Sequence, residues 1–259
     1  MIHRLLQYLV VTTLVLVLAG CTGEDSSDKA KKELLVYCGI TMVHPMKKIA
    51  SLVEAAQDCK VTIVQGGSED LYQSLKMSGV GDLYMPGSQY YREKHLSEGL
   101  LGDYVEVGYN QAALVVAKGN PKQVSAEIDS LTDSSLNVVI GNPETCSIGK
   151  QAEKILTKAG IFQQVVDNAV TLAADSRNMN KQLLDGRADL IFNWRATAFF
   201  EGNRAKMDAL SLDPSVAPKN KLLINLLSFS ARPELARAFM DVAASERGQR
   251  IFRDFGFLD

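Results

Sequence analysis

Short apolar runs alternate with segments of helical periodicity over most of the chain. The run from Leu34 to Tyr37 is continuously apolar, as expected for a strand that is buried on both faces. Residues 42–56 then carry apolar side chains at helical spacing, with Pro45 in the first turn, where its missing N–H costs little. The same patterns predict strands at 61–64, 82–85, 112–117, 137–140, 170–173, 188–192 and 222–229. They predict helices after Ser68, around 90–98, and at 148–159, 179–184 and 233–252.

Strands that alternate with helices indicate an α/β fold, built on open, mostly parallel sheets with helices on their faces. Because the pattern restarts after residue 108, we predict two such lobes, joined by crossing strands, with a ligand cleft between them. Residues 34–108 plus 198–259 are assigned to lobe I, and residues 109–197 to lobe II.

The first 33 residues are interpreted as targeting and tether sequence. Residues 1–21 form a signal peptide with a short basic start and an apolar run from Leu9 to Leu18, shorter than the roughly 20 residues that span a bilayer. An uncleaved membrane anchor is the alternative. The run ends in Leu-Ala-Gly-Cys, which resembles a bacterial lipobox and implies that Cys21 is lipidated. Residues 22–33 are polar and predict a flexible tether, so we expect a periplasmic or cell-surface protein anchored to the membrane by lipid.

Composition and motifs exclude several classes of function. The chain has 259 residues and a formal net charge of -2, with Lys and Arg spread along its length, so we expect no nucleic-acid partner. It has no Gly-x-Ser-x-Gly elbow, phosphate loop or dinucleotide fingerprint, so we predict no catalytic residues, no cofactor and no enzymatic activity. His44 and His95 lack a Cys or carboxylate at ligand spacing, which argues against a metal site.

Three predicted strands end in turns rich in glycine and hydroxyl groups, each followed by a helix. These turns are Gly39-Ile40-Thr41, Gly66-Gly67-Ser68 and Cys146-Ser147-Ile148-Gly149. In open α/β sheets ligands lie beyond the carboxyl ends of the strands, where helix N-termini offer free N–H groups to an anion. Ser and Thr also cap helices without binding any ligand, so each turn fits either interpretation.

A series of motifs follows in order between residues 34 and 257. They are Val36-Tyr37-Cys38-Gly39-Ile40-Thr41, Gly66-Gly67-Ser68, Gly81-Asp82-Leu83-Tyr84, Gly141-Asn142-Pro143-Glu144, Ala188-Asp189-Leu190-Ile191, Arg247-Gly248-Gln249-Arg250-Ile251-Phe252 and Phe255-Gly256-Phe257. The series resembles the periplasmic molybdate-binding proteins of ABC transporters. This resemblance implies a type II periplasmic-binding fold, whose two lobes close on a small tetrahedral oxyanion such as molybdate or tungstate. It also implies a monomer and a membrane permease as partner.

The resemblance further implies ligand contacts: hydroxyl donors at Thr41 and Ser68, backbone N–H donors at Ile148 and Met179, and an aromatic side chain at Trp194. Ser147, in the lobe II turn, is a further hydroxyl candidate. Where the family usually has Tyr, this chain has Trp194. An indole N–H donates one hydrogen bond and accepts none, which suits a fully deprotonated oxyanion.

Two cysteines near the predicted cleft leave alternatives open. Cys38 stands where the family has a small residue, and Cys146 lies in the lobe II turn. They are either small buried apolar residues or thiolates that bind a thiophilic ligand such as arsenite or a soft metal. Cys59 is expected to be structural. Sulfate is another alternative ligand, and a ligand-sensing lipoprotein that signals without transport is the alternative role.

Overall fold

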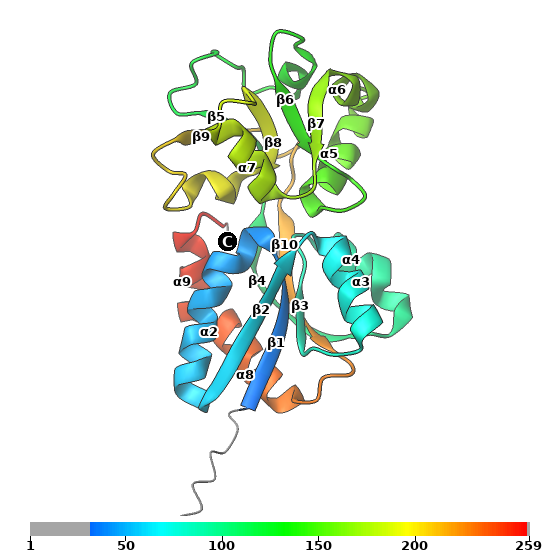
Figure 1. Ribbon diagram of the computed structural model, residues 1–259, viewed down its shortest axis with the longest axis vertical. Coiled ribbons are helices and arrows are strands. Elements are labelled where there is room, and N and C mark those ends of the chain that lie inside the picture. Colours follow the sequence, from blue (N-terminus) through cyan, green and yellow to red (C-terminus); the bar gives the residue numbers. More distant parts are fainter. Residues whose placement is uncertain (1–31, 258–259) are drawn as a thin grey trace, which may run out of the picture. The chain divides into compact units, whose positions relative to one another are not determined.

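A computed structural model describes residues 32–257 of the chain (Figure 1). The predictions for residues 1–31, among them the signal peptide and the lipidation of Cys21, lie outside the described residues. Within the described part of the chain, the helices are all too short or too polar to cross a membrane.

Strands and helices alternate along the described chain, as the hydrophobic pattern predicts. The strands are β1 (Lys32–Gly39), β2 (Cys59–Gly66), β3 (Leu83–Met85), β4 (Leu101–Asn110), β5 (Ala112–Ala117), β6 (Val138–Gly141), β7 (Ala169–Ala173), β8 (Leu190–Trp194), β9 (Met207–Ser211) and β10 (Asn220–Leu227). The α-helices are α2 (Val43–Gln57), α3 (Ser68–Ser78), α4 (Tyr90–His95), α5 (Ser147–Lys158), α6 (Phe162–Asn168), α7 (Ser176–Leu184), α8 (Pro233–Ala244) and α9 (Glu246–Asp254). Short 3-10 helices are η1 (Ile40–Met42), η2 (Leu96–Glu98), η3 (Ile128–Thr132) and η4 (Arg195–Phe199).

The strands form two five-stranded sheets, one in each lobe. The lobe I sheet has the order β2-β1-β3-β10-β4, and the lobe II sheet has the order β7-β6-β8-β5-β9. In each sheet three adjacent strands are parallel, and the remaining two pair antiparallel. The predicted two-lobed α/β fold is confirmed, with sheets that are mixed.

Strand β1 shows why the first apolar run of the sequence is continuous. Leu34, Val36 and Cys38 pack into one core with α2, α8 and α9. Leu35 and Tyr37, on the other face, pack into a second core with α3 and α4. Figure 1 shows these two sets of helices on opposite faces of the sheet. Because helices cover both faces, every position of the strand favours an apolar side chain.

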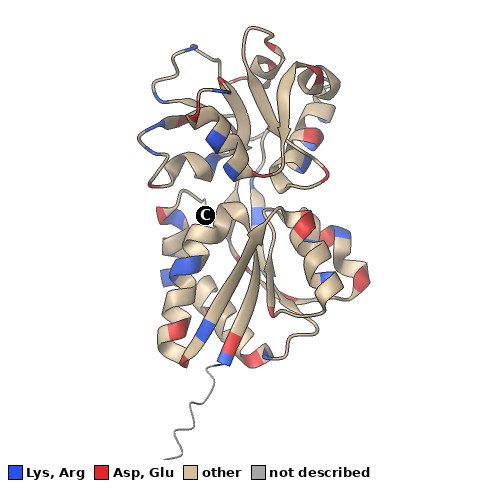
Figure 2. Ribbon diagram, viewed as in Figure 1, with Lys and Arg blue, Asp and Glu red and all other residues tan. Residues whose placement is uncertain are grey.

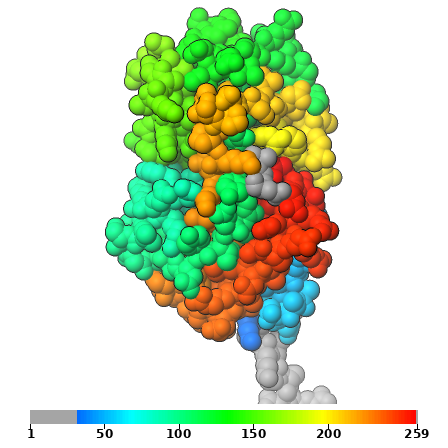
Figure 3. All heavy atoms as spheres, turned by 180° about the vertical axis from the view of Figure 1, so that it is seen from behind, coloured from blue at the N-terminus to red at the C-terminus, as the bar shows by residue number. Residues whose placement is uncertain are grey.

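The chain crosses between the lobes later than we predicted. Residue 111 joins β4 in the lobe I sheet to β5 in the lobe II sheet. The return follows β9, which pairs with β5, so residues 207–211 belong to the lobe II sheet and not to the segment 198–259 assigned to lobe I. Figure 3 shows this return, in orange, passing from the second lobe to the first. The short strand β9 has no apolar run that marks it in the sequence.

The helix predicted at 233–252 is two helices. Ser245 has an extended backbone, with φ -62° and ψ 161°, and its hydroxyl accepts a hydrogen bond from Gly248 N at 3.1 Å. This N-cap ends α8 and begins α9. Strand β4 and helix α6 were not predicted either.

Candidate functional site

The turns after several strands meet at a small cavity between the lobes. The turns after β1, β2 and β3 form its wall on the lobe I side, and those after β6 and β7 form its wall on the lobe II side. Its lining residues are Gly39, Ile40, Thr41, Met42, Gly66, Gly67, Ser68, Gly87, Cys146, Ser147, Asp175 and Ser176. This interlobe cavity has a volume of about 10 Å³, enough for the centre of about one water molecule.

Helices from both lobes begin at the interlobe cavity. In lobe I, η1 leads from Ile40 into α2, and α3 begins at Ser68. In lobe II, α5 begins at Ser147 and α7 at Ser176. The first N–H groups of a helix have no partner within it and carry a partial positive charge. Their convergence makes a wall that favours an anion without a full countercharge.

Two hydroxyl groups of the wall are oriented by protein donors. Ser68 Oγ accepts a hydrogen bond from Gly87 N at 3.0 Å, and Ser147 Oγ accepts one from Trp194 Nε1 at 3.2 Å. Each oxygen therefore already accepts from a protein N–H, and its own O–H remains to donate. This arrangement suits an acceptor-only ligand.

The other two hydroxyl groups of the wall belong to Thr41 on the lobe I side and Ser176 on the lobe II side, and each residue is only 4% exposed. Within residues 32–257, no hydrogen bond to the protein uses either hydroxyl. The sequence analysis missed Ser176. The signal was present, since Asp175 and Ser176 follow a strand and precede a helix, as in the three turns that were recognised.

Trp194 acts on the cavity through Ser147. The side chain is fully buried at the end of β8, and its N–H has Ser147 Oγ as acceptor. We expected this N–H to reach the ligand directly. In this structure the indole N–H donates to the serine hydroxyl, and a direct contact between Trp194 and the ligand stays a prediction.

The backbone N–H groups predicted at Ile148 and Met179 have partners in the protein. Met179 N donates to Asp175 O at 3.2 Å, as an ordinary helical hydrogen bond of α7. The N–H groups of Ile148 and Gly149 act on the Cys146 thiol, where they oppose the rise in its pKa that burial causes. Neither Ile148 nor Met179 lines the cavity, and both side chains lie in the lobe II core.

The two cleft cysteines are buried in separate cores. Cys38 lies in the lobe I core, where burial raises the pKa of its thiol far above the ordinary value. Cys146 lies in the lobe II core and lines the cavity, and burial raises the pKa of its thiol to about 12. Both groups therefore stay protonated at neutral pH, which disfavours thiolate ligation. Cys59 is buried too, in the same lobe I core as Cys38.

Asp175 places a carboxylate in the cavity wall. Its Oδ1 accepts a hydrogen bond from Asn178 N at 2.8 Å and so caps α7. A negative charge at this position opposes an anion, so it tunes the affinity that the helix N-termini provide.

The lobes approach most closely at two glycines. A Cβ atom at Gly67 would lie 2.6 Å from Thr145 O, and one at Gly87 would overlap Ser147 Oγ. Glu69 N also donates across the cleft to Thr145 O at 3.4 Å. Only glycine fits at these two positions when the lobes are this close.

His95 has carboxylate partners that the sequence spacing did not reveal. Its Nδ1 lies 2.9 Å from Glu98 Oε1, and its Nε2 lies 3.1 Å from Glu69 Oε2. The ring stacks on Tyr72, with the centroids 3.6 Å apart. These contacts tie α3 to α4 and η2, and within residues 32–257 there is no group of three His, Cys, Asp or Glu side chains suited to a metal ion.

A sequence model of the bacterial extracellular solute-binding proteins matches residues 34–258. The chain belongs to this family. Its members are extracellular solute-binding proteins, which agrees with a ligand cavity between two lobes.

Individual relatives agree with this family. A protein of Haemophilus influenzae that is named a binding protein is 28% identical over 226 residues, which cover 87% of this chain and 91% of the relative. The periplasmic molybdate-binding protein of Azotobacter vinelandii has a TM-score of 0.74 at 16% identity, over 87% of this chain and 99% of that one. The sulfate-binding protein of Mycobacterium tuberculosis has a TM-score of 0.74 at 15% identity, over 87% and 86%. These likenesses confirm the type II periplasmic-binding fold.

Proposed function

We propose that this protein is the solute-binding component of an ABC-type importer, held at the membrane by a lipid on Cys21. Its lobes close around a tetrahedral oxyanion such as molybdate or tungstate and deliver it to the membrane permease. One observation carries the proposal: hydroxyl groups and helix N-termini from both lobes converge on the interlobe cavity. The names of the Azotobacter and Mycobacterium structures support it, since molybdate and sulfate are both tetrahedral oxyanions.

Binding is coupled to closure in this mechanism. Lobe I contributes Thr41 and Ser68, and lobe II contributes Ser147 and Ser176, so a complete set of donors exists only when the lobes meet. An anion that leaves water for these fixed donors therefore stabilises the closed arrangement. The permease would recognise that arrangement.

A thermal-shift screen of the purified full chain tests the proposal. The panel is molybdate, tungstate, sulfate, phosphate, arsenite and divalent metal ions. A ligand at 100 times its Kd stabilises the folded protein by about 2.7 kcal/mol, which a melting curve resolves. We expect a shift with at least one tetrahedral oxyanion. No shift with any oxyanion would contradict the proposal.

The cysteines provide the internal control for ligand chemistry. In the double variant C38S/C146S we expect the oxyanion-induced shift to persist, because both thiols are buried and protonated. A shift that occurs only with arsenite or a soft metal, and that the double variant loses, would favour the thiophilic alternative.

A further inference from the structure

A second, larger cleft opens from the interlobe cavity. Its volume is about 1050 Å³, and its walls are α2 and the C-terminal segment of lobe I together with α7 and the chain after η4 of lobe II. It shares Ile40, Thr41 and Ser176 with the interlobe cavity. A ligand group held by these hydroxyls is therefore continuous with the space of the larger cleft.

The interlobe cavity and the larger cleft differ in volume. In this closed arrangement the interlobe cavity has a volume of only about 10 Å³, because Gly67 and Gly87 allow its walls to come close together. The larger cleft is at the upper end of the range for small-molecule sites. Space for a ligand therefore lies on the side of Thr41 and Ser176, which open into the larger cleft.

The larger cleft is positively charged although the chain is not. Its charged lining residues are Lys47, Lys48, Arg177, Lys181, Asp185 and Glu201. Four cations face two carboxylates, which leaves an excess of two positive charges, whereas the whole chain has a formal net charge of -2. Figure 2 shows basic residues on both α2 and α7, the helices that flank the cleft. The local excess favours a ligand with more than one negative charge.

An aromatic surface forms part of the same cleft. The centroid of the His44 ring lies 5.2 Å from that of Phe200 and 6.0 Å from that of Phe255. The three rings therefore form one patch, contributed by α2, the chain after η4 and the C-terminal segment. Burial, and then the charges of Arg177 and Lys47, lower the pKa of His44, which keeps its imidazole neutral near neutral pH. A neutral aromatic patch packs against the carbon skeleton of an organic molecule, and an inorganic ion has no group for it.

We infer that the preferred solute carries its tetrahedral oxyanion as the phosphoryl group of a small organic phosphate, which also has a second anionic group. Its phosphoryl oxygens bind at Thr41 and Ser176, and its carbon skeleton lies along the His44–Phe255 patch. The second anionic group lies near Lys47 and Lys48. This inference rests on the proposed function, since the phosphoryl group is the tetrahedral oxyanion of that proposal, now with an organic substituent.

Isothermal titration calorimetry on the full chain tests the inference with a graded set of compounds. The set is inorganic phosphate, molybdate, glycerol 3-phosphate, 3-phosphoglycerate and glycerate. Glycerol 3-phosphate lacks the second anionic group, and glycerate lacks the phosphoryl group. We expect 3-phosphoglycerate to bind at least tenfold more tightly than inorganic phosphate or molybdate, and glycerol 3-phosphate to bind with an intermediate affinity.

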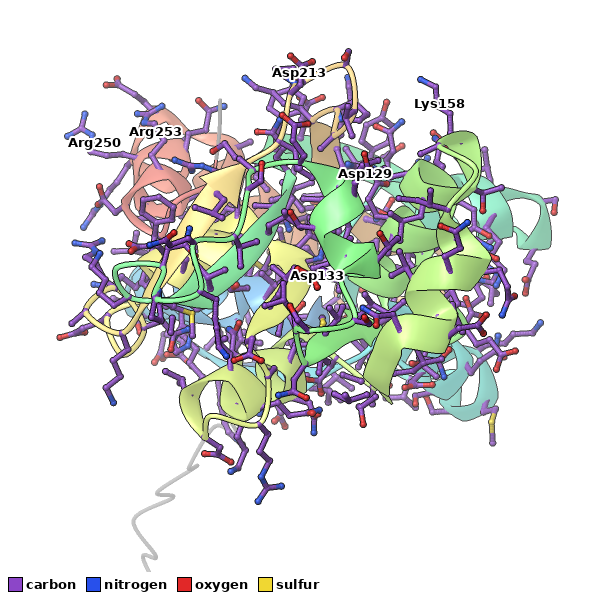
Figure 4. All side chains as sticks on the ribbon, turned by 90° about the horizontal axis from the view of Figure 1, so that it is seen from above. Asp129, Asp133, Lys158, Asp213, Arg250 and Arg253 are labelled. Carbon is purple, nitrogen blue, oxygen red and sulfur yellow. The ribbon has the colours of Figure 1, made fainter. Side chains whose placement is uncertain are left out.

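A double variant isolates the basic cleft. Lys47 and Lys48 are exposed on α2, so K47Q/K48Q leaves the core intact. We expect it to weaken 3-phosphoglycerate binding about tenfold and to change the affinity for inorganic phosphate less than twofold. The matched control is K60Q/R250Q, which removes the same charge from residues outside the cleft, and we expect no effect on either ligand. Figure 4 shows Arg250 projecting outward from α9.

The outcomes separate this inference from the proposed function. Molybdate or inorganic phosphate that binds as tightly as every organic phosphate would overturn the inference and leave the proposed function standing. Equal weakening of both ligand classes in K47Q/K48Q, or the same weakening in K60Q/R250Q, would also overturn it. If no compound in the set binds, the inference fails, and the proposed function fails with it only if tungstate and sulfate also give no shift in the thermal-shift screen.

Discussion

At the residue scale, the cavity combines donors with one opposing charge. The hydroxyl groups of Ser68 and Ser147 are held by protein N–H donors, so their own protons point to a ligand. Asp175 is the exception, because its carboxylate caps α7 while it lines the cavity. Its position implies that helix capping and anion affinity compete at one side chain.

The variant Asp175→Asn tests this competition. Asn also caps helices, so the fold is retained while the charge is removed. A like charge about 4 Å away costs about 1 kcal/mol even in bulk water, so we expect sulfate or molybdate to bind at least about fivefold more tightly, as measured by calorimetry.

Asp133→Asn is the matched control for this change. Asp133, labelled in Figure 4, also accepts a backbone hydrogen bond, from Ser135 N at 2.8 Å, but it is not among the residues that line the cavity. We expect no change in affinity there. Weaker anion binding in Asp175→Asn would mean that the carboxylate accepts a hydrogen bond from a protonated ligand, such as the one that a hydrogen phosphate donates.

At the element scale, an ion network fastens α4 and η2 to α3. Glu98 accepts hydrogen bonds from Lys76 and His95, and these lower its pKa from 4.5 to about 2. Glu69 joins the network through His95 and Lys94. The network therefore fastens α3, which begins at Ser68, to α4, which follows Gly87 in the chain.

The network predicts a pH dependence of stability that Glu98→Gln removes. A carboxyl group with a lowered pKa stabilises the fold above its unfolded pKa, and this contribution is lost as pH falls toward the folded pKa. We expect the wild-type protein to melt at a higher temperature than Glu98→Gln at pH 7. The difference should shrink between about pH 4.5 and about pH 2. A difference that stays constant over this range would show that Glu98 titrates at its ordinary pKa.

At the scale of the whole described unit, the cavity lies between two lobes, so ligand affinity depends on how closely the lobes approach each other. Gly87 and Ser147 come from different lobes and touch where the lobes meet. Arg177 of α7 also reaches Gln65 of β2, with a distance of 2.9 Å from Nη2 to Oε1. The closed arrangement thus depends on small residues at the contact as well as on polar bonds across it.

The variant Gly87→Ala tests closure directly. Its methyl group would overlap Ser147 Oγ, and overpacking of this kind costs about 1–3 kcal/mol. Because the lobes can relieve the overlap by opening, we expect the ligand affinity to fall about tenfold or more, while the melting temperature without ligand changes little.

Small-angle X-ray scattering should then show a larger radius of gyration for Gly87→Ala than for the wild type in saturating ligand. Gly202→Ala is the matched control, because a Cβ at Gly202 would meet no atom within 4 Å. Wild-type affinity in Gly87→Ala would contradict a role for this contact in closure.

Sequence alone determined the repeating unit of the fold. The apolar run at 34–37 and the helical spacing at 42–56 depend on neighbours a few residues apart, so local pattern predicts them. The same holds for the Gly- and hydroxyl-rich turns that end at Thr41, Ser68 and Gly149. The resemblance to a family led us to expect Cys38, Cys146 and Trp194 near the cleft. In the structure Cys146 lines the cavity, Trp194 contacts it through Ser147, and Cys38 lies in the lobe I core.

Tertiary structure decided which groups meet and what each one does there. The acceptor of Trp194 Nε1 is 47 residues away in sequence, and β9 is a strand because β5 lies beside it. The large basic cleft likewise exists only where α2 and α7 face each other. These features depend on contacts between segments that are distant in sequence, and the local spacing of residues does not predict which distant segment a residue will contact.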